Sequence, residues 1–238
     1  MKHEKSIGFG SSYRKRHEEQ ESWVAKYLDT FFYPYISKDF KRNTDTELQK
    51  LGIDLMLTGA TKAITIDEKA SVEWCNCGLN KYSMELSLLT YDKHTGNPYE
   101  ISGWYMSDSL STHMELVFID SATTVNNRYL TGSGITEATV VIINKKEFQK
   151  VLDGKGWTKE NLKRKSDMVR KAFNEYGSEY WKYVNCGTLK GTQAHFYIQE
   201  KPQEHAVNIQ FSKQFLIEHS EYSAKIANGK INVLKKAS

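Results

Sequence analysis

Two short apolar segments interrupted by charge constrain this chain more than any other part of its sequence. The first, Gly52–Thr58, contains Asp54, and the second, Ile64–Ser71, contains Asp67 and Lys69. Strands rich in apolar and β-branched residues pack into protein cores. A charged group inside such a strand costs several kcal/mol unless it is paired or binds a metal. We therefore expect the two acids and the lysine to meet at one site.

The link between the two segments predicts how they pair. Residues 59–62 include a glycine and have the length of a hairpin connection. Side chains alternate between the faces of a strand, so Asp67 and Lys69 share one face and Glu68 lies on the other. The same alternation suits the solvated face of an edge strand, with Asp54 in a turn, and this alternative stays open.

The residue types in these segments indicate a chemistry. Divalent cations such as Mg²⁺ or Mn²⁺ prefer oxygen ligands, which the carboxylates of Asp54 and Asp67 supply. A lysine near a bound metal can orient its water or help to deprotonate it, and can offset the charge of a phosphate. Lys69 is the predicted residue for that role.

This arrangement resembles the PD-(D/E)-x-K nuclease superfamily, in which an aspartate is followed by Asp/Glu-x-Lys on the next strand. The resemblance rests on residues 52–54 (Gly-Ile-Asp) and 67–69 (Asp-Glu-Lys), and it covers roughly residues 14–120. The sequence departs from the pattern because no proline precedes the first aspartate. Glu-Leu-Ser at residues 85–87 and Gly-Trp at residues 103–104 resemble an uncharacterised group of phage and bacterial proteins.

The resemblance implies an α/β fold with a central mixed β-sheet flanked by helices, the restriction-endonuclease-like core. It implies a metal-dependent nuclease that hydrolyses DNA phosphodiester bonds in phage or bacterial DNA processing. Asp54 and Asp67 would bind Mg²⁺ (or Mn²⁺) together with the main-chain carbonyl of Glu68. Lys69 would orient the attacking water and stabilise the charge that develops on the phosphate.

Two further acids are candidates for the same site. Residues 14–32 have the apolar spacing of an amphipathic helix, and Glu21 lies at the edge of its apolar face. Many members of the superfamily carry an acid on the helix before the first strand, which makes Glu21 a catalytic candidate. An ordinary solvated helix acid is an equal alternative. Glu85, inside the apolar segment Ser83–Tyr91, is a weaker candidate.

A basic helix supplies the candidates for DNA binding. The helix predicted from Thr158 to about Tyr176 is mostly basic, and we predict that Lys163 and Arg164 contact phosphates. Acidic residues interrupt this charge, so a solvated face is the alternative. The net charge of +4 is compatible with a nucleic-acid groove and does not establish one.

The rest of the sequence bears on the domain organisation and the cellular compartment. We expect residues 1–12 to form a flexible tail and residues 13–238 to form one nuclease-like domain with a C-terminal strand and helix extension. No segment approaches the ~20 apolar residues of a membrane span. Three cysteines, an odd number, argue against a disulfide framework and favour the cytoplasm. Cys75, Cys77 and Cys186 could bind zinc, but they lack the paired C-x-x-C spacing of such sites.

Two other classes of function remain open at the level of sequence. A catalytically inactive protein with the nuclease fold could bind DNA or serve in an assembly, although an intact set of two aspartates and a lysine argues against lost activity. A structural or partner-binding protein without a nucleic-acid role is favoured by the modest net charge. The sequence also leaves open whether RNA is a substrate and which oligomer forms, with a homodimer as one candidate.

Overall fold

Two compact units, each with its own β-sheet, make up the computed structural model of this chain. The sequence led us to expect one domain over residues 13–238. Unit 1 comprises Met1–Leu79, Ser111–Ile142 and Ser220–Ser238, and unit 2 comprises Asn80–Leu110 and Ile143–His219. The residues that the structure describes are 7–58, 63–92, 94–185, 194–199 and 205–236.

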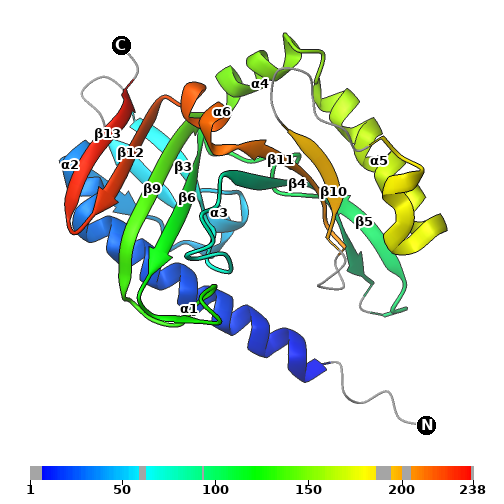
Figure 1. The fold of residues 1–238 in the computed structure, drawn as a ribbon, viewed down its shortest axis with the longest axis horizontal. Coiled ribbons are helices and arrows are strands. Elements are labelled where there is room, and N and C mark those ends of the chain that lie inside the picture. The colour runs from blue at the N-terminus through cyan, green and yellow to red at the C-terminus, as the bar shows by residue number, and fades with distance from the viewer. Residues whose placement is uncertain (1–6, 59–62, 93, 186–193, 200–204, 237–238) are drawn as a thin grey trace. The chain divides into compact units, whose positions relative to one another are not determined.

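A seven-stranded sheet is the base of unit 1. In chain order its strands are β1 (Asp39–Arg42), β2 (Leu55–Thr58), β3 (Ala63–Ala70), β6 (His113–Ser121), β9 (Ile135–Asn144), β12 (Tyr222–Ala227) and β13 (Lys230–Lys236). Their spatial order is β1-β2-β3-β6-β9-β12-β13, and Figure 1 shows the last four side by side. β3 and β6 are parallel, whereas β1–β2, β2–β3, β9–β12 and β12–β13 are antiparallel. The chain is therefore α/β with a mixed sheet, as we predicted.

Helix α1 (Ile7–Phe31) lays its apolar side on one face of this sheet. Val24, Tyr27 and Leu28 pack in one core with buried residues of β2, β6, β9 and β12. The apolar spacing that predicted a helix over residues 14–32 therefore builds the core, although α1 begins earlier, within the predicted tail. In the described part of the chain no helix, α1 included, is long and apolar enough to cross a membrane. Two short helices follow, α2 (Tyr33–Ile36) and α3 (Thr46–Lys50).

The C-terminal part of unit 1 is a β-hairpin. Helix α6 (Lys213–Glu218) is short, and the β12–β13 hairpin follows it. Its turn residues Asn228 and Gly229 have φ angles of +51° and +71°, the left-handed backbone that a two-residue type I′ turn requires.

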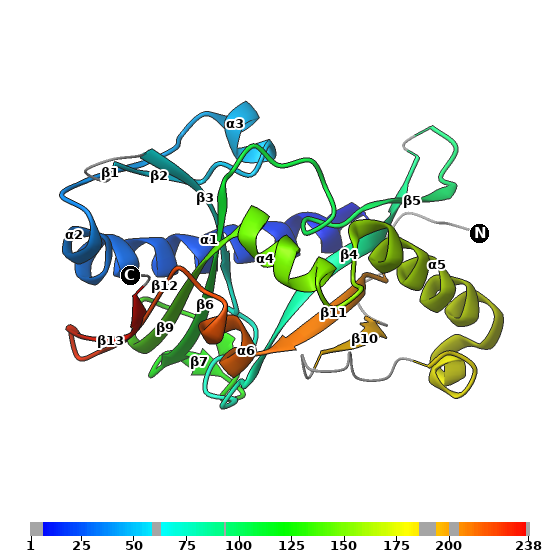
Figure 2. The ribbon, with the colours of Figure 1, turned by 90° about the horizontal axis from the view of Figure 1, so that it is seen from above.

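Unit 2 is built on an antiparallel sheet of four strands. These are β4 (Lys81–Tyr91), β5 (Pro98–Ser102), β10 (His195–Ile198) and β11 (Val207–Ser212), in the order β10-β11-β4-β5. Its other helices are α4 (Lys145–Asp153), α5 (Lys159–Tyr176) and the 3₁₀ helix η1 (Gly177–Lys182). Helix α5 packs against β4, β10 and β11 (Figure 2).

A small ribbon of unit 1 consists of β7 (Thr124–Val125) and β8 (Tyr129–Leu130).

A close backbone contact follows the end of β5. β5 ends at Ser102, and Gly103 comes directly after it. A Cβ atom on Gly103 would lie 2.5 Å from the main-chain carbonyl carbon of Glu85, so a larger residue does not fit there. The N–H of Gly103 donates to the carbonyl of Leu86 at 2.9 Å. The chain after β5 is thereby held directly against the backbone of β4.

Candidate metal and catalytic site

Asp54 stands at the entrance to β2, and its backbone is held from two sides. Its N–H donates to the carbonyl of Ile66 in β3 at 2.9 Å. Its own carbonyl accepts a hydrogen bond from the N–H of Asn43 at 2.9 Å. These two bonds fix the direction in which the side chain of Asp54 leaves the sheet.

The Asp54 carboxylate takes the place of a strand partner beside β3. Pairing between β2 and β3 ends at Leu55 and Ile66. Two residues further along β3, the N–H of Glu68 donates to Asp54 Oδ2 at 2.8 Å. Burial raises the pKa of Asp54 to about 6, against the lowering effects of Lys69 and of the Glu68 N–H. A bound cation would relieve this, because a nearby positive charge favours the carboxylate form.

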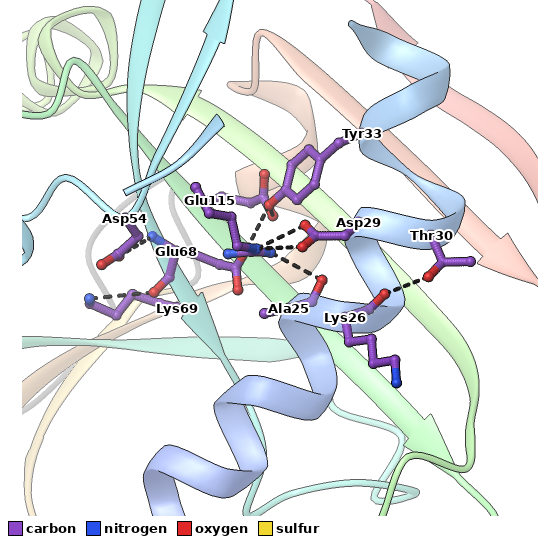
Figure 3. Close-up of polar contacts among 10 residues, drawn as sticks. Ala25, Lys26, Asp29, Thr30, Tyr33, Asp54, Glu68, Lys69 and Glu115 are labelled. Atoms are coloured by element: carbon purple, nitrogen blue, oxygen red, sulfur yellow. Dashed lines mark hydrogen bonds and ion pairs between the residues drawn. The ribbon is translucent and has the colours of Figure 1, made fainter. Parts of the chain in front are cut away.

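Asp67 and Lys69 form an ion pair on one face of β3. The side chain of Asp67 is 4% exposed and that of Lys69 is 31% exposed. Burial lowers the pKa of Lys69, but Asp67 and Asp54 raise it by more, so its net shift is upward. Lys69 Nζ also lies 3.5 Å from the carbonyl oxygen of Glu68, and Figure 3 shows Asp54 and Lys69 on the same side of that residue. Lys69 is therefore a charged hydrogen-bond donor at neutral pH and a poor general base.

Glu21 reaches the edge of this group from α1. Its carboxylate lies 3.2 Å from His17 Nδ1, and its side chain is 52% exposed. The charge of Glu21 also contributes to the raised pKa of Lys69. The side chain of Glu21 is therefore largely exposed, and its part in the site stays a prediction.

A second polar cluster surrounds the side chain of Glu68 on the opposite face of β3 (Figure 3). The Tyr33 hydroxyl oxygen lies 2.6 Å from Glu68 Oε2 and 2.8 Å from Glu115 Oε1. Arg42 Nη2 donates to Glu68 Oε2 at 3.1 Å. Arg42 Nε donates to both carboxylate oxygens of Asp29, at 2.8 and 2.9 Å. The side chain of Glu68 is thus anchored from α2 and β1.

Counting donors in this cluster places a proton on Glu115. The hydroxyl of Tyr33 has one proton but lies between two carboxyl groups, so one of them must donate. Glu68 has the cation of Arg42 as a partner, whereas Glu115 is fully buried. Burial raises the pKa of Glu115 well above its ordinary value, and the charge of Glu68 adds to this. Neutral Glu115 therefore donates to Tyr33, which donates to Glu68.

Three predicted site residues belong to unit 2. Glu85 lies on β4 and is half-buried. Lys163 lies on α5 and pairs with Asp167 at 3.1 Å, and Arg164 on the same helix donates to Asn161 Oδ1 at 3.4 Å. The structure defines each unit by itself, so a contribution of these side chains to the site in unit 1 stays a prediction.

The donors around Asp54 and Asp67 suit a hard cation that keeps much of its own water. Among the residues that the structure describes, no three or more Asp, Glu, His or Cys side chains form a group that could hold a metal. Mg²⁺ commonly binds through one or two carboxylates and completes its shell with water and substrate phosphate, so the donor set fits that ion. Zinc fits less well. Burial raises the pKa of Cys75 to about 11, which disfavours the thiolate, and Cys186 lies outside the described residues.

Sequence reasoning missed Tyr33, Arg42 and Glu115. A signal for Glu115 is present, because this acid interrupts the apolar run His113–Ile119 in the way that Asp54 interrupts its own segment. Tyr33 and Arg42 carry no comparable local signal, since they reach Glu68 from elements that become neighbours only on folding.

Comparison with known proteins adds no assignment to this geometry. No family model, no curated protein and no solved structure matches the chain. The function therefore has to be inferred from the chemistry of the site itself.

Proposed function

We propose that this chain is a metal-dependent nuclease that hydrolyses DNA phosphodiester bonds with Mg²⁺ or Mn²⁺, on a restriction-endonuclease-like core. The observation that carries the proposal is the meeting of Asp54, Asp67 and Lys69 beside β2 and β3. A buried aspartate paired with a lysine lies near a second acid whose pKa burial raises to about 6. Such a group suits a cation beside a phosphate better than it suits a solvated strand face.

Each residue has a role in this reaction. Asp54 and Asp67 would hold the cation with the main-chain carbonyl of Glu68, and the bound ion would supply Lewis acidity and a water of lowered pKa. Lys69, kept charged by its acidic neighbours, donates hydrogen bonds to the attacking water and to the phosphate oxygens that gain negative charge. Glu21 assists at the exposed edge through water.

The DNA is the partner that the basic residues of α5 would recognise. Lys163 and Arg164 would contact phosphates without reading sequence, which is how most basic side chains contribute to DNA affinity. The side chain of Lys163 is 70% exposed. Exchanging its ion pair with Asp167 for a contact to a phosphate would therefore involve little desolvation. Glu85 on β4 is the weaker acidic candidate.

A catalytically inactive DNA-binding or assembly protein is the second candidate. The observation that favours it is that, among the described residues, no three Asp, Glu, His or Cys side chains form a group that could hold a metal. The ion pair between Asp67 and Lys69 would then serve stability alone.

A cleavage assay separates the two candidates. Purified protein is incubated with supercoiled plasmid, linear duplex, single-stranded and branched DNA in Mg²⁺, in Mn²⁺ and in EDTA. We expect cleavage of at least one substrate with metal and none in EDTA. Binding of DNA without cleavage of any substrate would favour the inactive protein.

Lys69→Ala tests the catalytic role of the lysine. Because Lys69 acts mainly on the transition state, the variant should keep DNA and metal binding and lose cleavage by about a hundredfold or more. Lys225→Gln is the control, because it breaks another ion pair of the same sheet, with Glu137 at 2.6 Å. Wild-type cleavage by Lys69→Ala would show that the lysine is only a structural partner of Asp67.

A further inference from the structure

The side chain of Glu68 is held firmly on the face of β3 that lies away from the candidate site. It is 10% exposed and accepts hydrogen bonds from Tyr33 at 2.6 Å and from Arg42 at 3.1 Å. Arg42 is itself fixed by α1, through the carboxylate of Asp29 and the carbonyl of Ala25, the latter at 3.1 Å. A planar guanidinium with several fixed partners has little freedom to change its position.

The main chain of the same residue faces the candidate site. The N–H of Glu68 holds Asp54 Oδ2 at 2.8 Å, and its carbonyl oxygen lies 3.5 Å from Lys69 Nζ. On its other edge β3 pairs with β6, where Glu68 lies opposite Glu115. Beside β2 the regular pairing has already ended, so a side chain rather than a strand meets the Glu68 N–H. The position of the Glu68 main chain therefore sets where the Asp54 carboxylate lies.

We propose that Arg42 and Tyr33 are positioning residues that act through Glu68. By holding its side chain on one face of β3, they fix the position of the Glu68 main chain. The N–H of Glu68 holds Asp54, and the Glu68 carbonyl would be available to the proposed metal. The effect on catalysis rests on the proposed nuclease function, whereas the effect on the position of Asp54 does not.

The energetics of the cluster support a geometric role over a purely stabilising one. A buried ion pair adds little net stability compared with apolar side chains of the same size, because desolvation offsets the attraction. What Arg42, Tyr33 and Glu68 supply is a fixed geometry. Residues that orient metal ligands in this way commonly change metal affinity or activity by about 10- to 100-fold when they are altered.

The test uses Tyr33→Phe and Arg42→Gln in the full chain, with Lys225→Gln as the matched control. In metal-free protein, the amide resonance of Glu68 reports its hydrogen bond to Asp54, and Asp54→Ala shows how that resonance moves when the bond is lost. We expect both variants to move it in that direction and the control to leave it unchanged. Mn²⁺ affinity by calorimetry should fall about 10- to 100-fold, and kcat should fall more than KM for DNA rises.

Arg42→Lys adds a graded comparison. Lysine keeps the charge but loses the guanidinium fork that joins Asp29 to Glu68, so it should restore only part of the Mn²⁺ affinity. A wild-type Glu68 resonance and Mn²⁺ affinity in folded Tyr33→Phe would overturn the proposal. That variant removes only a hydroxyl, so it decides the matter if Arg42→Gln does not fold. Wild-type protein that neither binds Mn²⁺ nor cleaves DNA would overturn the nuclease function alone, because the resonance still tests the positioning of Asp54.

Discussion

Folding buries Asp54 in surroundings that disfavour its charged form. Its pKa rises from 3.8 to about 6 in the folded protein because burial disfavours the carboxylate. The folded state therefore binds this proton more tightly than the unfolded state does. The contribution of Asp54 to stability is fully present below pH 3.8 and is lost as the pH rises through about 6.

Asp54→Asn tests this directly. Asparagine keeps an acceptor for the Glu68 N–H and removes the charge. Near pH 8 in metal-free buffer, we expect the variant to be more stable than the wild type by about 1–3 kcal/mol. The difference should disappear by about pH 4, where the wild-type acid is protonated in both states. Urea unfolding at a series of pH values measures the free energies, and a wild type that is the more stable protein near pH 8 would contradict the raised pKa.

Glu115→Gln tests the proton that donor counting assigns to the buried cluster. Glutamine keeps a donor for Tyr33, as the neutral acid does, and cannot ionise. The raised pKa of Glu115 means that its contribution to wild-type stability is fully present at acidic pH and is lost as the pH rises toward that pKa. Glu115→Gln should therefore be at least as stable as wild type at neutral pH, with an advantage that grows toward alkaline pH.

Thermal unfolding of both proteins between acidic and alkaline pH gives this comparison. Tyr33→Phe is the contrast, because it leaves buried carboxyl oxygens of Glu68 and Glu115 without their hydroxyl partner. We expect the free energy of unfolding of Tyr33→Phe to be about 1–3 kcal/mol lower than that of the wild type. Strong destabilisation by Glu115→Gln at neutral pH would show that Glu115 is ionised in the folded protein.

At the scale of elements, the contact between Gly103 and β4 predicts a sharp difference between two glycines of unit 2. Gly103→Ala would force its Cβ against the main chain of Glu85 at 2.5 Å, so we expect a loss of about 1–3 kcal/mol. Gly154 has a φ of −60° and its nearest neighbour would lie 3.5 Å from an added Cβ. Gly154→Ala should be neutral or slightly stabilising. Equal unfolding free energies for the two variants would contradict the close contact.

Apolar patterning predicted the buried elements and failed for the exposed ones. The runs that became β6 and β9 are buried almost throughout, and the apolar stripe of α1 forms the core. β13 is mostly exposed and rich in lysine, so hydrophobic periodicity gives no signal for it. The local signal was the Asn228-Gly229 pair, a sequence that favours a type I′ turn and that we did not recognise.

In the candidate site, too, some residues could be predicted from the sequence and others could not. Asp54, Asp67 and Lys69 could be found because a charge in an apolar strand needs an explanation at the level of sequence. Their anchors could not, because Tyr33 and Arg42 contact Glu68 across 35 and 26 residues of chain. No local pattern specifies such contacts, which depend on the pairing of whole strands and helices.

At the scale of the whole molecule, the division into two units predicts where a metal acts. Asp54 and Asp67 lie in unit 1, which has its own sheet and core. At a hundredfold excess over its Kd, a cation that binds only the folded state stabilises it by about 2.7 kcal/mol. Hydrogen exchange with Mn²⁺ should show increased protection in β3 and β6 and little change in β10 and β11. Asp67→Ala should abolish the effect, and equal protection of both sheets would show that the units unfold together.

The parallel pairing of β3 with β6 has a consequence for the nascent chain. Thr65 and Thr112, which are hydrogen-bonded at the start of this pair, are 47 residues apart, whereas Asp54 and the Glu68 N–H are 14 residues apart. At about 5–20 residues per second, the ribosome needs several seconds to supply β6 after β3. During that interval the acids of the site can already meet, but the far edge of β3 has no partner strand. A ribosome that stalls between the two strands would hold an apolar edge open to other chains, so translation pauses in this interval should favour aggregation or chaperone binding.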